Sequence, residues 1–464
     1  MEVLPEDVLA DVLGRLAPRC LAVARRVCTA WRAAVDGRRL LRADLLPLAV
    51  GGIFINTDNS WMTWLLSRPT AGPAVSADLS YAAVEAMSTD PYFIGSPFKV
   101  RDHCNGLLLL PDCVLNPATT QRARLPPPPP PPPPCAPEDY FYTDEYIAYD
   151  PAASPHYEVV SVPRVRVRVY RGDEARELVP GLEGSEWPPA SCAMHVWSSR
   201  TRRWEARCFV REGQPAGTIA DMRVDTRVGT RTEHREAAYW RGALYVLCQA
   251  DFVMRLSLSS DTYQVIQPPV PEFELYDDCM YDEILGGRRL SIGKSKNGVY
   301  SILVDQSHIR LWILDETDGQ IKWEPKPFYW PPPSVTTPLH SLESDAPWML
   351  QPILSYGDSF DSDIAEAMAP EKFEWDSDVD NVLEPEKWGF RWFITFLGFH
   401  PFKEVIFLND STQRVLAYHM NGFKIQYLGD VLPRDAGRYI NDDVCVQSSF
   451  PYTPCWMVDL SENE

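Results

Sequence analysis

The sequence predicts a small all-α module at residues 1–46 followed by an all-β domain at residues 47–460, for which a six-bladed β-propeller fits best, with seven or eight blades as alternatives. Near the start, apolar residues recur at helical spacing. Further along, a pattern of strand, turn and strand recurs several times. The 464 residues include 43 Pro, 25 Gly, 15 Trp and 20 Tyr, which favours a turn-rich β body over a helical one.

A first helix is expected to begin near Pro5, because proline suits the first helical position. Glu6 and Asp7 follow in the first turn, where their carboxylates face the positive end of the helix dipole. The apolar stripe of this helix is Val8, Leu9, Val12, Leu13 and Leu16.

A second helix is expected to open at Pro18, which also ends the first. Its apolar residues are Leu21, Val23, Ala24, Val27 and Cys28, and Trp31 closes the pattern. Three short helices in so few residues cannot bury all these side chains against each other. Part of the apolar surface therefore needs a partner outside the module.

This arrangement resembles the F-box. The residues that carry the resemblance are Leu4-Pro5, the Leu-rich stretch from Leu9 to Leu16, Arg15-Leu16 before the turn, and Val27-Cys28-Thr29-Ala30-Trp31-Arg32. The chain departs from the pattern at Ala17, where many members carry a second proline. The resemblance covers the N-terminal module alone.

The resemblance implies that the module docks on the Skp-type adaptor of a ubiquitin ligase, and through it on cullin. The adaptor-binding residues it implies are Leu4, Pro5, Leu9, Val12, Leu13, Leu16, Leu21, Val27, Cys28 and Trp31. Residues 1–46 are slightly basic within an acidic chain, which suits an acidic adaptor. The alternative is that the module is a helical cap, with its stripe buried against the chain's own β domain.

In the β domain, five units share a template of strand, short turn, strand, polar turn and aromatic strand. They begin at Asn105, Tyr146, Gly242, Gly298 and Glu404. A sixth unit is expected from Leu46 to Leu79 together with Val444 to Trp456. Joining both ends of the chain in one blade would close the ring and remove exposed strand edges.

Three short motifs of the β domain resemble the F-box-associated and kelch-like regions of plant F-box proteins. They are Cys104-Asn105-Gly106-Leu107-Leu108, Asn116-Pro117-Ala118-Thr119 and Gly398-Phe399-His400-Pro401. Each motif is weak alone, and the similarity depends on their order along the chain.

Three segments interrupt or stand out from this pattern. The proline run at 126–134 predicts a stiff polyproline II loop, either a spacer between blades or a ligand for an aromatic groove. The acidic insertion at 341–388 predicts a long loop on one face of the ring, either solvated or recruiting a basic partner. Arg164, Arg166 and Arg168 alternate with valines and predict either an outer strand with a solvent-exposed basic face or a groove for phosphate or an acidic peptide.

The net charge of −20 argues against nucleic-acid and anionic membrane partners, which need a basic face. Acidic residues near the start replace the basic segment of a secretory signal, so we expect a cytoplasmic or nuclear protein. The 11 cysteines are scattered without a C-x-x-C pair, and the eight histidines are dispersed, so neither a metal site nor any other cofactor is expected.

No nucleophile elbow, phosphate-binding loop or dinucleotide motif occurs in the sequence. We therefore expect a non-catalytic substrate-recognition subunit of a Skp-cullin-F-box ubiquitin ligase, whose propeller binds an unknown target protein. The alternative is a stand-alone propeller enzyme or a carbohydrate-binding protein with a helical cap. Co-purification of the adaptor separates the two.

Overall fold

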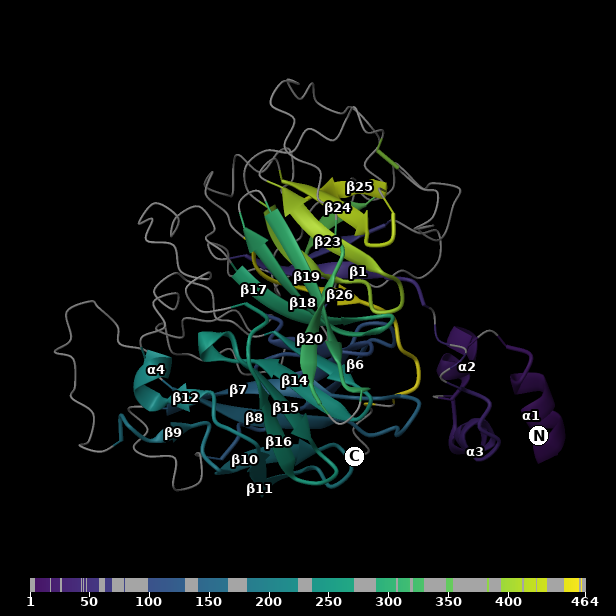
Figure 1. Ribbon diagram of the computed structural model, residues 1–464. Coiled ribbons are helices and arrows are strands. Elements are labelled where there is room, and N and C mark those ends of the chain that lie inside the picture. Colours follow the sequence, from purple (N-terminus) through teal and green to yellow (C-terminus); the bar gives the residue numbers. More distant parts are fainter. Residues whose placement is uncertain are drawn as a thin grey trace, which may run out of the picture.

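The computed structural model describes residues 5–57, 63–68, 79, 99–129, 141–165, 182–223, 236–270, 289–328, 348–353, 382–383, 394–431 and 446–460, except positions 17, 26, 43, 45, 47, 306–307, 318–319, 411–412, 423 and 459. Three helices stand to one side of a body built from strands (Figure 1). Leu4, most of the proline run and most of the acidic insertion lie outside the described residues.

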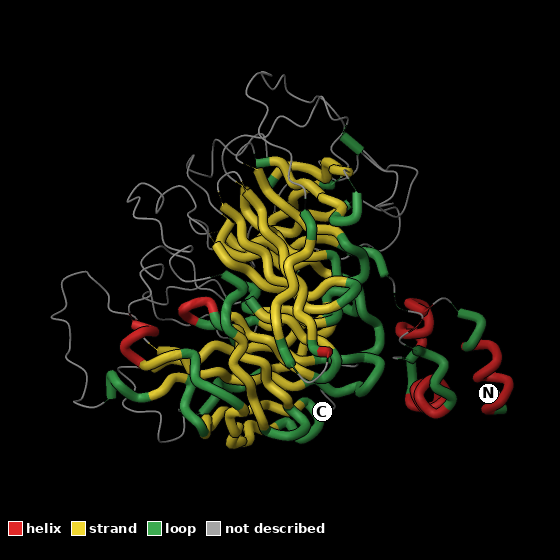
Figure 2. Tube along the Cα trace, viewed as in Figure 1, coloured by secondary structure: helices red, strands yellow, loops and turns green. Residues whose placement is uncertain are grey.

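The helical module consists of α1 (Glu6–Leu13), α2 (Pro18–Ala24) and α3 (Thr29–Gly37). Figure 2 shows these helices grouped together and set apart from the sheets. Pro5 immediately precedes α1 and Pro18 opens α2, as their fixed backbone angle favours.

Among the described residues, the strands form four four-stranded sheets, one eight-stranded sheet and one two-stranded sheet. The closing sheet has the order β21 (Met349–Pro352), β2 (Thr63–Ser67), β1 (Gly52–Thr57), β26 (Val446–Tyr452). Three further sheets run in chain order: β3 (Asp102–Cys104), β4 (Leu107–Leu109), β5 (Cys113–Asn116), β6 (Gln121–Arg124); β17 (Arg289–Ser295), β18 (Gly298–Asp305), β19 (His308–Asp315), β20 (Lys322–Lys326); and β22 (Ile394–Phe399), β23 (Val405–Asp410), β24 (Arg414–His419), β25 (Lys424–Asp430).

The eight-stranded sheet consists of two antiparallel four-stranded halves. One half is β7 (Phe141–Ala148), β8 (Glu158–Val165), β10 (Ser191–Ser198), β11 (Arg203–Glu212), and the other is β13 (Ala237–Trp240), β14 (Ala243–Leu247), β15 (Val253–Ser257), β16 (Thr262–Ile266). The outer strands β11 and β16 pair in parallel and join the halves. Beside them lie β9 (Glu186–Trp187), β12 (Gly217–Thr218), α4 (Ile219–Arg223) and a 3-10 turn, η4 (Gln249–Asp251).

The two ends of the β domain meet in the closing sheet. Strand β26 pairs antiparallel with β1, with Phe54 opposite Phe450 and Ile55 opposite Ser449. This confirms the expected pairing of the segment after the module with the C-terminal stretch. The pairing hydrogen-bonds one edge of β1 and joins segments almost 400 residues apart.

Buried apolar clusters lie between neighbouring four-stranded groups all the way round. The closing sheet shares one cluster with the β3–β6 sheet and another with the β22–β25 sheet. Further clusters join the β3–β6 sheet to the β7–β11 half, the two halves to each other, the β13–β16 half to the β17–β20 sheet, and that sheet to the β22–β25 sheet. The first strands β3, β13, β17 and β22 and the last strand β26 contact one another in a circuit, and β7, the first strand of the remaining group, contacts β3. Each group therefore buries both of its faces.

Two sequence expectations were wrong in part. Within the acidic insertion, Met349–Pro352 forms β21 and pairs with β2, so this part is an edge strand and not a loop. The sequence predicts a solvent-exposed face for Arg164, but its side chain is 3% exposed. It faces Asp144 across the sheet, with 3.4 Å between Arg164 Nε and Asp144 Oδ2. Arg166 and Arg168 lie outside the described residues.

Candidate functional site

The helical module has a small apolar core of its own. Leu9, Leu13 and Leu21 are 8%, 1% and 2% exposed, and they pack together with residues of α3. Trp31 is half-buried against the same cluster. These four residues were predicted to contact an adaptor, and the structure gives each of them a role in packing the three helices together.

A second group of apolar side chains on the module faces solvent. This exposed apolar set is Val8 (45%), Val12 (49%), Leu16 (38%), Val23 (60%) and Val27 (61%). Val8, Val12 and Leu16 are spaced four residues apart, so they follow one face of α1 and of the turn after it. Five exposed large apolar residues on so small a module are typical of a protein-binding surface.

The structure thus divides the predicted adaptor-binding residues. Val12, Leu16 and Val27 belong to the exposed apolar set, and Pro5 and Cys28 are also exposed. Val8 and Val23 were seen in the sequence as apolar but were not among the predicted contacts. The spacing of apolar residues cannot separate those that face the core of the module from those that face solvent. The apolar stripe of α1 is wide enough to include both kinds.

Ion pairs hold the module together, and a hydrogen bond from one of the paired residues attaches it to the β domain. Arg38, just after α3, pairs with Asp7 of α1, and Arg25, just after α2, pairs with Asp36 of α3 with its Nε 2.7 Å from the carboxylate. Nη1 of Arg25 also donates a hydrogen bond of 3.3 Å to the carbonyl oxygen of Met457. Arg25 therefore links all three parts: two helices and the C-terminal segment.

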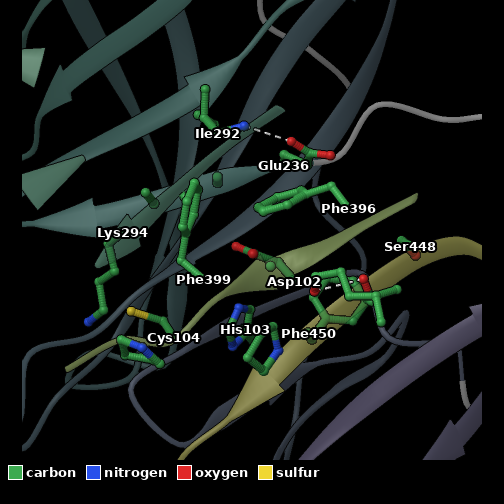
Figure 3. Close-up of a pocket in the computed structure, with 18 of the residues that line it drawn as sticks. Asp102, His103, Cys104, Glu236, Ile292, Lys294, Phe396, Phe399, Ser448 and Phe450 are labelled. Atoms are coloured by element: carbon green, nitrogen blue, oxygen red, sulfur yellow. Dashed lines mark hydrogen bonds between the residues drawn. The ribbon is translucent and has the colours of Figure 1, made fainter. Parts of the chain in front are cut away.

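A cavity of about 90 Å³ lies where the first strands of the sheets meet. Its walls come from β3, β13, β17, β22 and β26, and from short stretches next to them. Figure 3 shows Asp102, His103 and Cys104 of β3 on one side and Lys294 of β17 reaching toward Cys104. No residue of this cavity was among the sequence-predicted sites.

Glu236 and Arg289 form an ion pair at the wall of the cavity. Glu236 accepts hydrogen bonds from Arg289 Nη2 (3.0 Å), Ser291 Oγ (3.0 Å) and the backbone amide of Ile292 (2.8 Å). Burial raises the pKa of the Glu236 carboxyl, and the Arg289 guanidinium opposes that effect. Each of the two charges is neutralised by the other within the protein.

Asp102 is 2% exposed and accepts a hydrogen bond of 2.9 Å from the backbone amide of Ile147. Burial raises the pKa of Asp102 to about 7, partly offset by backbone hydrogen bonds. Next to it, burial lowers the pKa of His103 to about 4, and the positive charge of Lys294 lowers it further. His103 is therefore neutral at physiological pH, and Asp102 is partly protonated.

Lys294 is the remaining cation of this cavity. Its Nζ donates to the side-chain oxygen of Asn105, whose own Nδ2 donates to the carbonyl oxygen of Tyr149 at 2.5 Å. Burial lowers the pKa of the Lys294 ammonium. Asn105 has φ +45°, a left-handed conformation that asparagine tolerates better than most residues, and this directs its amide toward Lys294.

Aromatic rings line the rest of the cavity. Phe396 and Phe399 have ring centroids 4.9 Å apart, and Phe450 packs edge-on against His103 with centroids 5.5 Å apart. The Phe399 ring lies over the backbone of Gly293, where an added Cβ would stand 2.7 Å from its Cδ2. A glycine beside Lys294 is thus needed for this close contact.

Within the part of the chain that the structure describes, no cluster of three or more His, Cys, Asp or Glu side chains is placed to hold a metal ion. Of the described helices, none has the length and apolar character needed to cross a bilayer.

Comparison with known proteins bears on the module first. Residues 1–43 match the family described as F-box-like. No curated protein matches the chain.

Among solved structures, the chain is similar to YCF48 bound to D1 peptide (9% identity, TM-score 0.23, covering 82% of this chain and 83% of that one) and to YCF48 from Cyanidioschyzon merolae (9%, 0.24, 82% and 86%). It is also similar to a structure from a structural and mechanistic analysis of two prolyl endopeptidases (10%, 0.28, 92% and 53%). By the family match, residues 1–43 are an F-box-like domain, and a large β domain follows it.

Proposed function

We propose that this chain is the substrate-recognition subunit of a Skp-cullin-F-box ubiquitin ligase. The F-box-like module docks on a Skp-type adaptor and through it on cullin, while the β domain holds a target protein. The observation that carries this proposal is the exposed apolar set on a module that matches the F-box-like family. The chain itself would perform no catalysis and would act by raising the effective concentration of the target near the transferring subunit.

The β domain in this proposal is a six-bladed propeller, of the kind suggested by the resemblance to plant F-box-associated and kelch-like regions. The six four-stranded groups and the six clusters between them support this count. A ring of this kind presents loops on two faces, and we assign the target to one of them. We place the protein in the cytoplasm or nucleus, where such ligases operate.

The test is binding of the purified chain to a purified Skp-type adaptor, measured by calorimetry. Val12→Asp and Val27→Asp each put a charge into the exposed apolar set and should weaken binding about tenfold or more. The matched control is Val210→Asp, which charges an equally exposed valine (54%) on β11 of the β domain and should leave binding unchanged. Equal affinities for all four proteins would reject the adaptor role and favour the helical cap.

Proximity labelling in cells addresses the target. The intact chain should label both adaptor and target, whereas a chain lacking residues 1–46 should label the target alone. If removal of the module abolishes every label, target recognition by the β domain is rejected.

A further inference from the structure

The central cavity contains a lysine whose hydrogen-bonding capacity is largely unused. An ammonium group has three donors, and the described acceptor for Lys294 is the side-chain oxygen of Asn105. Among the described residues, no carboxylate forms an ion pair with the Lys294 ammonium. Burying an ammonium without a counter-ion destabilises the charged form, and Lys294 is half-buried. An anion bound beside it would stabilise that charge.

The carboxyl groups of the cavity do not serve as that counter-ion. Glu236 is engaged by Arg289, Ser291 and the amide of Ile292. Asp102 is directed toward the backbone amide of Ile147 on β7 and is partly protonated near neutral pH. His103 is neutral, so Lys294 is the cation of the cavity wall without an ion-pair partner among the described residues. The Asp150 carboxylate, which is outside the cavity wall, raises the pKa of Lys294 through space only.

The space beside Lys294 is small and apolar on its far side. A volume of about 90 Å³ corresponds to roughly six to nine water-sized groups. The rings of Phe396, Phe399 and Phe450 line it together with the side chain of Lys294. Polar side chains such as Glu236 and Ser448 line other parts of the wall, so the cavity offers both apolar and hydrogen-bonding contacts to a small ligand.

We propose that the central cavity is a binding site for a small carboxylate-bearing group, with the carboxylate on Lys294 Nζ and Asn105 fixing the ammonium, and with an apolar end against the three phenylalanine rings. The ligand is either a free organic acid or the carboxyl-terminal residue of a polypeptide, since both present the same chemistry. This site goes beyond the proposed ligase function and does not depend on it.

The test is direct binding of a matched pair of probes to the full-length protein, followed by calorimetry or ligand-observed NMR. Benzoate, which is small enough for a cavity of about 90 Å³, should bind saturably. Benzamide, its uncharged analogue, should bind at least about tenfold more weakly. Lys294→Met should lower affinity for the acid to that of the amide. Lys294→Arg, which keeps the charge, should retain part of the affinity.

The control variant is Lys322→Met, which removes a lysine of β20 that pairs with Glu324 outside the cavity. It should bind the acid like the unaltered protein. The unfolding midpoint of each variant shows whether a loss of binding affinity comes from misfolding. Comparison with Lys294→Arg and Lys322→Met separates the effect of the Lys294 charge from an effect on stability. Absence of saturable binding, equal binding of acid and amide, or full binding by folded Lys294→Met would each overturn the proposal.

A second pair of probes identifies the source of the carboxylate. A tetrapeptide ending in phenylalanine with a free carboxyl terminus should bind as tightly as the acid if the site accepts a chain end. If the acid binds and the peptide does not, the natural ligand is a free organic acid. Neither measurement includes an adaptor, so failure here is separate from failure of the ligase proposal.

Discussion

Arg25 of the helical module donates a hydrogen bond to the carbonyl oxygen of Met457, which follows the last strand of the β domain, while its guanidinium also pairs with Asp36 of α3. Arg25 therefore sets the position of the module relative to the β domain. The Arg25 side chain is 16% exposed, so the pair is screened less than the exposed ion pairs of the module.

We predict that Arg25→Met loosens the module without unfolding the β domain. The substitution keeps most of the apolar stem and removes the bonds to Asp36 and Met457. Amide hydrogen exchange should become faster in α2, α3 and residues 455–458, and remain unchanged in β14 and β23. Arg15→Met is the control, because Arg15 is 76% exposed and pairs within α1 and its following turn. Uniform acceleration throughout the chain would contradict a local joint.

We predict that the Asn56 side chain stabilises the closing sheet. Its Nδ2 donates to Val100 (2.7 Å) and Ser448 (2.8 Å), and its Oδ1 accepts from Thr63 (2.8 Å). Asn56→Ala would leave buried polar partners of three segments unsatisfied and should lower the free energy of unfolding in urea by roughly 2–4 kcal/mol.

The control for this experiment is Asn297→Ala, at an exposed asparagine that bonds to Glu404. It should change the free energy of unfolding by less than about 1 kcal/mol. If Asn56→Ala costs no more than the control, the closing sheet does not depend on this side chain.

The buried pair of Arg164 and Asp144 gives a prediction with two variants. Both side chains are under 5% exposed, and Arg164 also donates to the carbonyl oxygen of Leu247 at 2.8 Å. Arg164→Met leaves a buried carboxylate and should cost about 3–5 kcal/mol of unfolding free energy. Adding Asp144→Leu should recover at least half of that loss. A double variant less stable than the single one would show that Asp144 is stabilised by other groups.

The raised pKa of Asp102 predicts a pH dependence of stability. Its folded pKa is about 7 against 3.8 for the ordinary group, so between these values the folded state holds a proton that the unfolded state has lost. The stability of the native protein relative to Asp102→Asn should therefore fall as pH rises from 5 to 7, and level off above about 7.

The expected change between pH 5 and pH 8 is roughly 2–3 kcal/mol, measured by urea unfolding of both proteins at each pH. Asparagine keeps an oxygen for the amide of Ile147, so the comparison isolates the charge. A constant difference between the two proteins across this range would show that Asp102 is ionised in the folded state.

The strands that sequence inspection missed share one property. The units read from the sequence match β4 and β5, β14–β16, β18–β20 and β23–β25, but not the strands β3, β13, β17 and β22 that precede them. These first strands meet around the centre, where polar residues such as Asp102 and Lys294 face the cavity. In β3 and β17 these polar residues break the apolar pattern, so a search for apolar strands does not detect them. Strands β13 and β22 are largely apolar and were missed because the template of the sequence units began with the strand after them.

The sequence by itself determined the order of the molecule: a helical module with the residues of an F-box, a β body of repeated units, and two chain ends suited to one sheet. Local periodicity and turn residues are sufficient for these, because each concerns neighbours along the chain. Only the tertiary structure decided which apolar residues of α1 face solvent, that Arg164 is buried, and that Lys294 meets Asn105 beside a cavity that three phenylalanines also line. Those outcomes depend on distances between segments far apart in sequence, and no local pattern encodes such distances.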